Sequence, residues 1–379
     1  MLTNPKVRAF AYQALAIVVV VGFGAWLIAN LQQALAERNI ATGFGFLAQR
    51  AGFSIGEGLV PFSASDPFWR AYAVGIANTL TVSLVGILGA TVIGATLGLM
   101  RLSANPLVSG FARGYVEVFR NTPQLVQIIF WYAVVTRLPH PRDAFVPVEG
   151  VMVTNRGVYV PAAGDPGAFA LVLLALGAGS LVALWHHRRS VRRRLTTGEE
   201  RTTWPARAAL VAVPTVATWI AVGAPVGLSL PALEGFRVAG GASVSPEFIA
   251  LALGLALYIA AFIAEIVRAG IQAVPRGQVE TAQALGLRPR TISRFVVFPQ
   301  ALRIMVPPAT AQYVSLVKNS SLGVAIGYPE LFNVNNTILT LSGRVLEAIA
   351  IMMAVYLTIS LSVSVLMNAY NRAVQLKER

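Results

Sequence analysis

Residues 275–303 read PRGQVETAQALGLRPRTISRFVVFPQALR, a polar segment between two apolar stretches. Residues 278–285 are good helix formers, and Gly286 is placed to end the helix that they form. The spacing predicts a second short helix from about Thr291, and Pro299 fits the first turn of the next apolar helix. We therefore expect a compact, two-helix projection that a partner protein can bind.

The same segment carries a spaced motif that ends at a proline. Glu280, Thr281 and Ala282 are followed, after three further residues, by Gly286. After nine more residues come Val296, one intervening residue, Phe298 and Pro299. This spacing resembles the EAA loop of ABC-importer permeases, Glu-Ala-Ala-x3-Gly-x9-Ile-x-Leu-Pro, with substitutions at three positions. PQALRIMVPPAT at 299–310, LVKNSSL at 316–322 and EVFRNTPQLVQ at 117–127 are further similar to the polar amino-acid subfamily.

The resemblance implies an all-α polytopic membrane protein that imports polar L-amino acids across the inner (cytoplasmic) membrane. Its partners would be two ABC ATPase subunits, a second homologous permease subunit or a second copy of this chain, and a periplasmic amino-acid-binding protein. In that family Glu280 would contact the ATPase, Ala282 would allow its close approach and Gly286 would make the turn, with Thr281 and Pro299 completing the coupling motif.

Composition independently indicates a membrane protein. Hydrophobic residues make up 56% of the 379 residues and charged residues 12%, too little polar surface to cover a soluble fold. About eight apolar stretches are long enough to cross a bilayer. They lie at about 11–31, 72–100, 109–135, 168–184, 208–226, 246–266, from 302 onward, and 345–367.

Five of these spans would form the type I importer core, which divides the chain into four parts. An N-terminal span and outer loop occupy 1–71, the first part of the core 72–135, an insert with two extra spans and a basic loop 136–245, and the second part of the core 246–379. This enlargement is similar to that of the Q-type subunits of general L-amino-acid importers. For the first span, a cleaved signal peptide with Ala34-Leu35-Ala36 as its cleavage site is the alternative.

Charge distribution predicts the orientation. The net charge is +14, and most Lys and Arg fall in segments that lie on one side if both termini are cytoplasmic. Seven arginines between Arg188 and Arg207 are typical of a topology anchor that also meets anionic membrane lipid, and we expect no nucleic-acid partner.

The chain lacks the signature of an ATPase or a metalloenzyme. Its lysines, Lys6, Lys318 and Lys377, are not preceded by glycine, so no Walker A motif is present. It has no Cys and three His without metal-ligand spacing. We expect a permease without enzymatic activity or bound cofactor, with ATP and Mg²⁺ bound by the partner ATPase. A membrane-embedded hydrolase has no support in the sequence.

Polar residues within the apolar spans are the candidates for the substrate path. We expect Pro307 and Pro308 to interrupt the span that starts near residue 302, which then carries Lys318, Asn319, Ser320 and Ser321. These four could bind the carboxylate of an amino acid, and Glu117 or Glu265 its ammonium group. Glu117 also lies three residues before Arg120 on one helix face. Two alternatives stay open here: Lys318 as a structural counter-ion, and a channel or ion-coupled carrier for small polar solutes.

Overall fold

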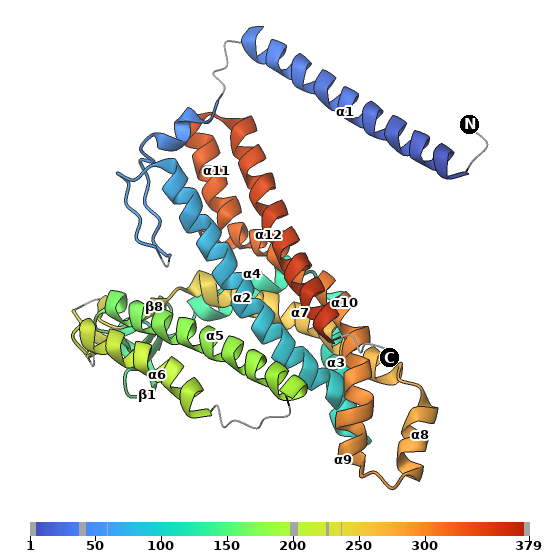
Figure 1. The fold of residues 1–379 in the computed structure, drawn as a ribbon. Coiled ribbons are helices and arrows are strands. Elements are labelled where there is room, and N and C mark those ends of the chain that lie inside the picture. Colours follow the sequence, from blue (N-terminus) through green and yellow to red (C-terminus); the bar gives the residue numbers. More distant parts are fainter. Residues whose placement is uncertain are drawn as a thin grey trace. The chain divides into compact units, whose positions relative to one another are not determined.

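The computed structural model describes residues 5–37, 43–58, 60–197, 204–224, 227–235 and 237–374 (Figure 1). The chain forms two compact units. One comprises Met1–Thr122 with Leu255–Arg379, and the other comprises Pro123–Gly254. The helix that runs from Pro246 to Gln272 contributes its first turns to the second unit and its remainder to the first.

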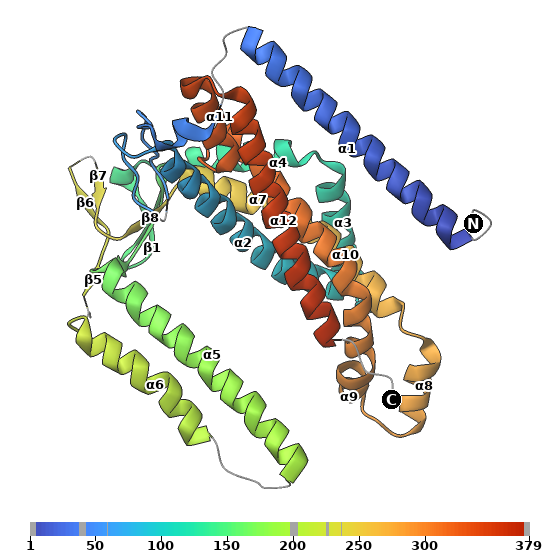
Figure 2. The same ribbon diagram turned by 45° about the horizontal axis from the view of Figure 1, so that its top comes forward.

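The described part of the first unit is mainly helical, with irregular segments at 49–58 and 60–67 (Figure 2). The chain places α2 beside α11, and α10 beside α12. Its helices are α1 (Pro5–Glu37), α2 (Phe68–Met100), α3 (Pro106–Asn121), the later turns of α7 (Pro246–Gln272), α8 (Arg276–Ala284), α9 (Pro289–Ile292), α10 (Phe298–Asn319), α11 (Leu331–Ser342) and α12 (Val345–Val374), with short 3₁₀ helices at Phe44–Ala48 and Ser320–Ile326.

The second unit combines a helical hairpin with short antiparallel strands. Helices α5 (Pro166–Thr197) and α6 (Trp204–Ala221) pack side by side, and α4 (Gln124–Thr136) precedes them. A four-stranded sheet has the order β1-β2-β3-β8, and β4-β5 and β6-β7 form separate pairs. The strands are β1 (Phe145–Val148), β2 (Val151–Thr154), β3 (Gly157–Val160), β4 (Ala162–Ala163), β5 (Leu228–Ser229), β6 (Ala232–Glu234), β7 (Arg237–Ala239) and β8 (Ala242–Val244).

The predicted fold class is confirmed in its main feature, because helices dominate the chain. The insert also contains β-strands, whereas the sequence predicted only some extended structure after residue 136. The hairpin signal is local: valines flank the Asn155–Arg156 turn, and Thr154 Oγ1 accepts from Arg156 N at 3.1 Å and donates to the carbonyl of Gly157 at 3.0 Å.

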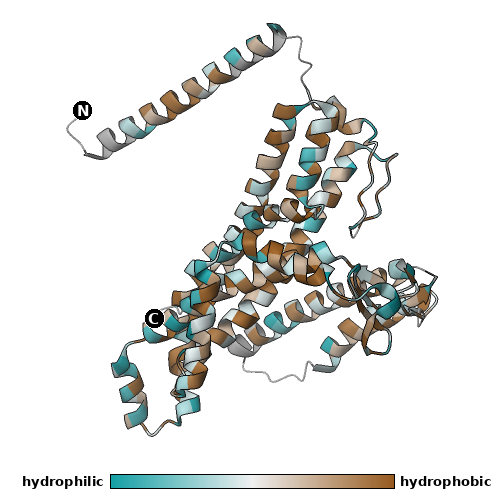
Figure 3. Cartoon of the chain, turned by 180° about the vertical axis from the view of Figure 1, so that it is seen from behind, coloured by the Kyte–Doolittle hydropathy of each residue, from teal (hydrophilic) through white to brown (hydrophobic). Residues whose placement is uncertain are grey.

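The expected count of eight spans is not reproduced. Among the described residues, four helices are long and apolar enough to cross a membrane: Phe68–Met100, Pro166–Val191, Pro246–Gln272 and Val345–Arg372. Tyr12–Leu27 and Gln124–Thr136 are shorter apolar helices. Figure 3 shows hydrophobic residues along the long helices and many hydrophilic residues in the loop that contains α8.

Prolines act differently at two places in the chain. At Pro123 the predicted span 109–135 divides into α3 and α4, because Thr122 leaves the helical conformation at φ −98° and ψ 130°. At Pro307 and Pro308 the predicted interruption is wrong, since α10 continues to Asn319. The interruption comes later, at the 3₁₀ segment 320–326, which Gly327 ends with φ +80°. Transmembrane helices tolerate proline where surrounding groups compensate for the lost hydrogen bonds.

Close packing of α2 against α7 depends on glycine. A Cβ atom on Gly94 would lie 2.6 Å from Ile263 Cβ, and one on Gly98 would lie 2.7 Å from Val267 Cβ. Both glycines belong to a row of four along α2, namely Gly86, Gly89, Gly94 and Gly98. The structure therefore assigns two of them to helix–helix contact, the function of small residues in lipid-embedded helices.

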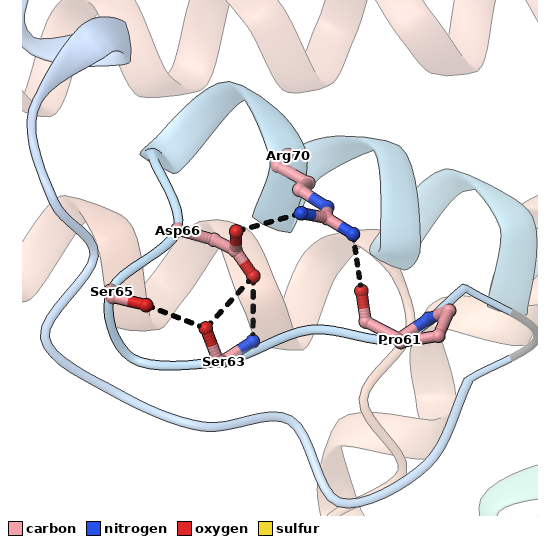
Figure 4. A network of polar contacts seen from close by, with 5 residues as sticks. All are labelled: Pro61, Ser63, Ser65, Asp66 and Arg70. Carbon is pink, nitrogen blue, oxygen red and sulfur yellow. Dashed lines mark hydrogen bonds and ion pairs between the residues drawn. The ribbon is translucent and has the colours of Figure 1, made fainter.

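The segment before α2 is held by a compact polar network (Figure 4). Asp66 accepts hydrogen bonds from Ser63 N at 2.7 Å and Ser63 Oγ at 3.1 Å, and it pairs with Arg70 at 2.7 Å. Arg70 also donates to the carbonyl of Pro61 at 3.0 Å. The backbone hydrogen bond from Ser63, aided by Arg70, lowers the pKa of Asp66 below its ordinary value. This network fixes how the chain enters α2.

Candidate functional site

The loop between α7 and α10 is a projection built from three short helical pieces. Helix α8 ends before Gly286, whose φ of +74° only glycine adopts without strain. Helix α9 follows, and a π-helical turn at Ser293–Val297 leads directly into α10. Gln300 at the start of α10 donates to Gln278 of α8 and, at 2.8 Å, to the carbonyl of Val296. The two ends of the loop are thereby joined.

The motif residues divide by exposure. Glu280, Thr281 and Gly286 are exposed, and Thr281 Oγ1 donates to the carbonyl of Gly277 at 2.7 Å. Ala282 is only 5% exposed, so its small side chain serves the packing of α8 within the loop itself. Pro299 is partly buried in the first turn of α10. A groove of about 740 Å³ runs beside α8, lined by Ile271, Gln272, Val274, Arg276, Val279, Glu280, Gln283 and Val297.

The sequence did not predict that two apolar side chains on this loop are exposed. Leu285 is 75% exposed and Phe295 is 68% exposed, although each belongs to a polar segment outside the membrane spans. As exposed apolar side chains on the loop that carries the motif, both are candidates for contact with a partner protein. Their position in the sequence was an available signal, since Leu285 lies next to Gly286 and Phe295 next to Val296, both residues of the spaced motif.

A second feature is a cavity of about 410 Å³ beside α12. Its volume lies in the range of small-molecule binding pockets. The residues that line it are Lys318, Ser321, Phe332, Met352, Met353, Tyr356, Leu357 and Ser360. Lys318 and Ser321 are thus brought to one site, as members of the predicted carboxylate-binding group.

The other two members of that group are placed differently. Ser320 is fully buried, and its hydroxyl donates to the carbonyl of Val317 at 2.7 Å. Asn319 ends α10 and is absent from the cavity wall. Within the described part of the chain Lys318 forms no ion pair, so the counter-ion alternative has no partner carboxylate there.

The other charged candidates, Glu117, Arg120 and Glu265, are absent from the wall of this cavity. Glu265 forms ion pairs with Arg268 on its own helix and with Arg101 at the end of α2. Arg120 places its guanidinium over the ring of Phe262, 5.1 Å from the centroid, while Glu117 is exposed. None of the three lines the cavity, so their assignment to the substrate path stays a prediction.

A fully buried carboxylate, Glu330, holds Tyr356, which lines the cavity. It accepts hydrogen bonds from Phe332 N, Asn333 N and the hydroxyl of Tyr356, each at 2.8 Å. The first two cap the N-terminus of α11, and the third fixes a residue of α12. Sequence reasoning missed Glu330, although an acidic residue directly before an apolar helix is a typical capping signal.

Comparison with known proteins gives the family of this chain. Residues 208–378 match the family model described as binding-protein-dependent transport system inner membrane component. The chain is 44% identical to a putative amino-acid ABC transporter permease protein, YhdX, of Escherichia coli (99% of this chain, 96% of the relative). It is equally 44% identical to the general L-amino acid transport system permease protein AapQ of Rhizobium johnstonii, over 99% of this chain and 94% of that protein.

A third relative carries a different substrate description. The glutamate/glutamine/aspartate/asparagine transport system permease protein BztB of Rhodobacter capsulatus is 36% identical over 99% of this chain and 96% of its own length. These similarities extend over the insert as well as the core, because each alignment spans nearly the whole chain. Taken with the exposed loop and the apolar helices, they show that the chain belongs to the family of ABC-transporter permeases that form the inner membrane component of binding-protein-dependent transport systems.

Proposed function

We propose that this chain is the permease subunit of an importer that carries polar L-amino acids into the cell across the cytoplasmic membrane. The amino-acid substrate is supported by the names of the relatives. A periplasmic amino-acid-binding protein would deliver the substrate, and a second homologous permease subunit or a second copy of this chain would complete the pathway. The channel and ion-coupled alternatives offer no reason for an exposed cytoplasmic docking loop.

The observation that carries the proposal is the construction of the loop at 276–297. It presents Glu280 and Thr281 beside exposed Leu285, and Gly286 and the Gln278–Gln300 hydrogen bond hold its shape. A rigid loop transmits displacement from a partner to α7 and α10, whereas a flexible one would absorb it. Two cytoplasmic ATPase subunits that bind ATP and Mg²⁺ are the partners proposed here.

Energy coupling then follows from differential binding. ATP stabilises the closed ATPase dimer more than the open one, and only such a difference shifts a conformational equilibrium. If the loop moves with the ATPase, α7 and α10 move with the loop because both begin or end at it. Access to the cavity beside α12 would then alternate between the two sides of the membrane.

Two substitutions, one on α8 and one directly after it, test this proposal. We expect Glu280→Lys and Leu285→Ala each to weaken ATPase binding about tenfold or more, since loss of a hot-spot residue costs about 2 kcal/mol or more and about 1.4 kcal/mol is a factor of ten. The measurement is co-purification of the ATPase with the tagged permease, together with uptake of labelled amino acids by proteoliposomes. Glu149→Lys, an exposed change in the β1–β2 turn, is the matched control. Full ATPase binding by both loop variants would refute the docking assignment.

A further inference from the structure

The hydroxyl of Ser360 is the exception among the hydroxyl residues near it on α12. Those of Thr358, Ser362 and Ser364 donate to carbonyls four residues earlier, at 2.7, 2.8 and 2.9 Å. Such bonds are the usual way in which a helix satisfies its own hydroxyl groups. Ser360 is 7% exposed, and its Oγ has no hydrogen-bond partner within the described residues. A buried, unpaired hydroxyl implies a partner that the chain itself does not supply.

The position of Ser360 identifies where that partner lies. It follows Tyr356 by one helical turn on the same face of α12, and both residues line the 410 Å³ cavity. The hydroxyl of Tyr356 is engaged by Glu330 at 2.8 Å. That bond holds this face of α12 in place, which leaves Ser360 as the unsatisfied hydroxyl on a fixed wall.

The charge of the wall indicates the chemistry of the ligand. Lys318 is the charged residue among the eight that line the cavity in the described structure, and no carboxylate lines it. An ammonium and a hydroxyl are both donors to a carboxylate, and a hydrogen bond to an ionised acceptor is stronger than one between neutral groups. A cationic side chain would face Lys318 without a compensating anion on this wall.

We propose that Ser360 donates a hydrogen bond to a carboxylate of the transported amino acid beside Lys318, and that this wall selects neutral and acidic amino acids over cationic ones. The inference rests on the proposed function, because it takes the cavity to lie on the substrate path. It adds to that function a contact residue from α12 and a substrate class.

Equilibrium binding to the assembled, purified transporter tests the contact, with labelled L-glutamate, L-glutamine and L-arginine as probes. We expect Ser360→Ala to weaken glutamate and glutamine binding about tenfold, the loss typical of a charge-assisted hydrogen bond. The control is Ser362→Ala, which removes a hydroxyl already bonded to its own helix and should bind like the unaltered transporter. Arginine should bind the unaltered transporter more weakly than glutamate does.

A second measurement covers the case in which Ser360→Ala fails to assemble. The chain has no cysteine, so Ser360→Cys introduces its single thiol. Glutamate should slow modification of that thiol by a small methanethiosulfonate reagent. Modification of Ser362→Cys, on the exposed face of α12, should be unaffected by glutamate.

Each outcome separates the contact from the function. Lys318→Ala is measured in the same binding assay. If Lys318→Ala binds glutamate weakly while Ser360→Ala binds it normally, or if glutamate does not protect the thiol, the Ser360 contact is overturned and the importer assignment stays intact. Normal glutamate binding by both variants, with ATPase association retained, shows that the cavity is not the substrate site. Arginine binding as tight as glutamate binding overturns the substrate class.

Discussion

At the scale of single residues, Glu330 is a buried side chain whose hydrogen bonds connect α11 and α12. It is fully buried, and three donors occupy its carboxylate. Two are backbone amides that would otherwise be unsatisfied at the start of α11, and one is the Tyr356 hydroxyl. One side chain thereby determines both where α11 begins and how α12 presents its cavity face.

We therefore expect Glu330→Ala to lower the free energy of unfolding by about 3 kcal/mol or more, because three buried donors lose their acceptor together. Tyr356→Phe removes a single hydroxyl and should cost about 1 kcal/mol. Thermal unfolding of the purified protein in detergent measures both effects. Glu149→Ala, at an exposed turn, serves as control, and equal stability of Glu330→Ala and this control would contradict the capping function.

At the scale of secondary-structure elements, the contact between α2 and α7 is set by backbone proximity. Gly94 lies so close to α7 that a Cβ atom would approach the Ala260 carbonyl oxygen to 2.8 Å. At the C-terminal end of α2 the same two helices are joined by the ion pair of Arg101 with Glu265, which also pairs with Arg268 on its own helix. Packing in lipid lacks a strong hydrophobic driving force, so such close contact and polar bonding have to hold the helices together.

Gly94→Ala should consequently destabilise the protein by about 1–3 kcal/mol, the usual cost of inserting a methyl group into a tightly packed contact. Gly110→Ala is the matched control, because a Cβ atom there meets nothing within 4 Å. The midpoint of thermal unfolding should fall for the first variant and not for the second. Alanine favours a helix more than glycine does, so a lowered midpoint for both would mean that contact of the added methyl group with lipid or a partner, rather than proximity to α7, governs the result.

At the scale of the whole molecule, the orientation in the membrane is the property that links both proposed sites to function. The sequence predicts cytoplasmic termini and a cytoplasmic loop at 275–303, because basic residues concentrate in segments that this arrangement places inside. The strands of the insert would then lie on the outer side. These assignments follow from charge distribution and stay predictions.

Single-cysteine variants of this cysteine-free chain test the orientation directly. We expect Glu149→Cys, in the exposed β1–β2 turn, to react in intact cells with a thiol reagent that reaches the periplasm but does not cross the inner membrane. Arg290→Cys, exposed on α9, should react only after the inner membrane is permeabilised. Reaction of Arg290→Cys in intact cells would place the docking loop outside and remove the basis for ATPase coupling.

Local signals in the sequence account for a well-defined part of this structure. The loop helices, the glycine turn at Gly286 and the start of α10 near Pro299 follow from backbone preferences that act within a few residues. Pro123 divides a predicted span for the same reason. The strands at Val151–Thr154 and Gly157–Val160 likewise follow a local hairpin pattern, with valines on both sides of a turn.

The sequence by itself thus determined the membrane class, the family motif and the helical loop that carries this motif, because hydrophobicity and turn chemistry are encoded in neighbouring residues. Only the tertiary structure decided that Lys318 and Ser321 share a cavity with Tyr356 and Ser360, and that Glu330 supports it. It also decided that α10 continues past Pro307 and Pro308. The physical reason is that a cavity and a buried hydrogen-bond network depend on which distant helices pack together, and helix packing is not written in any local pattern.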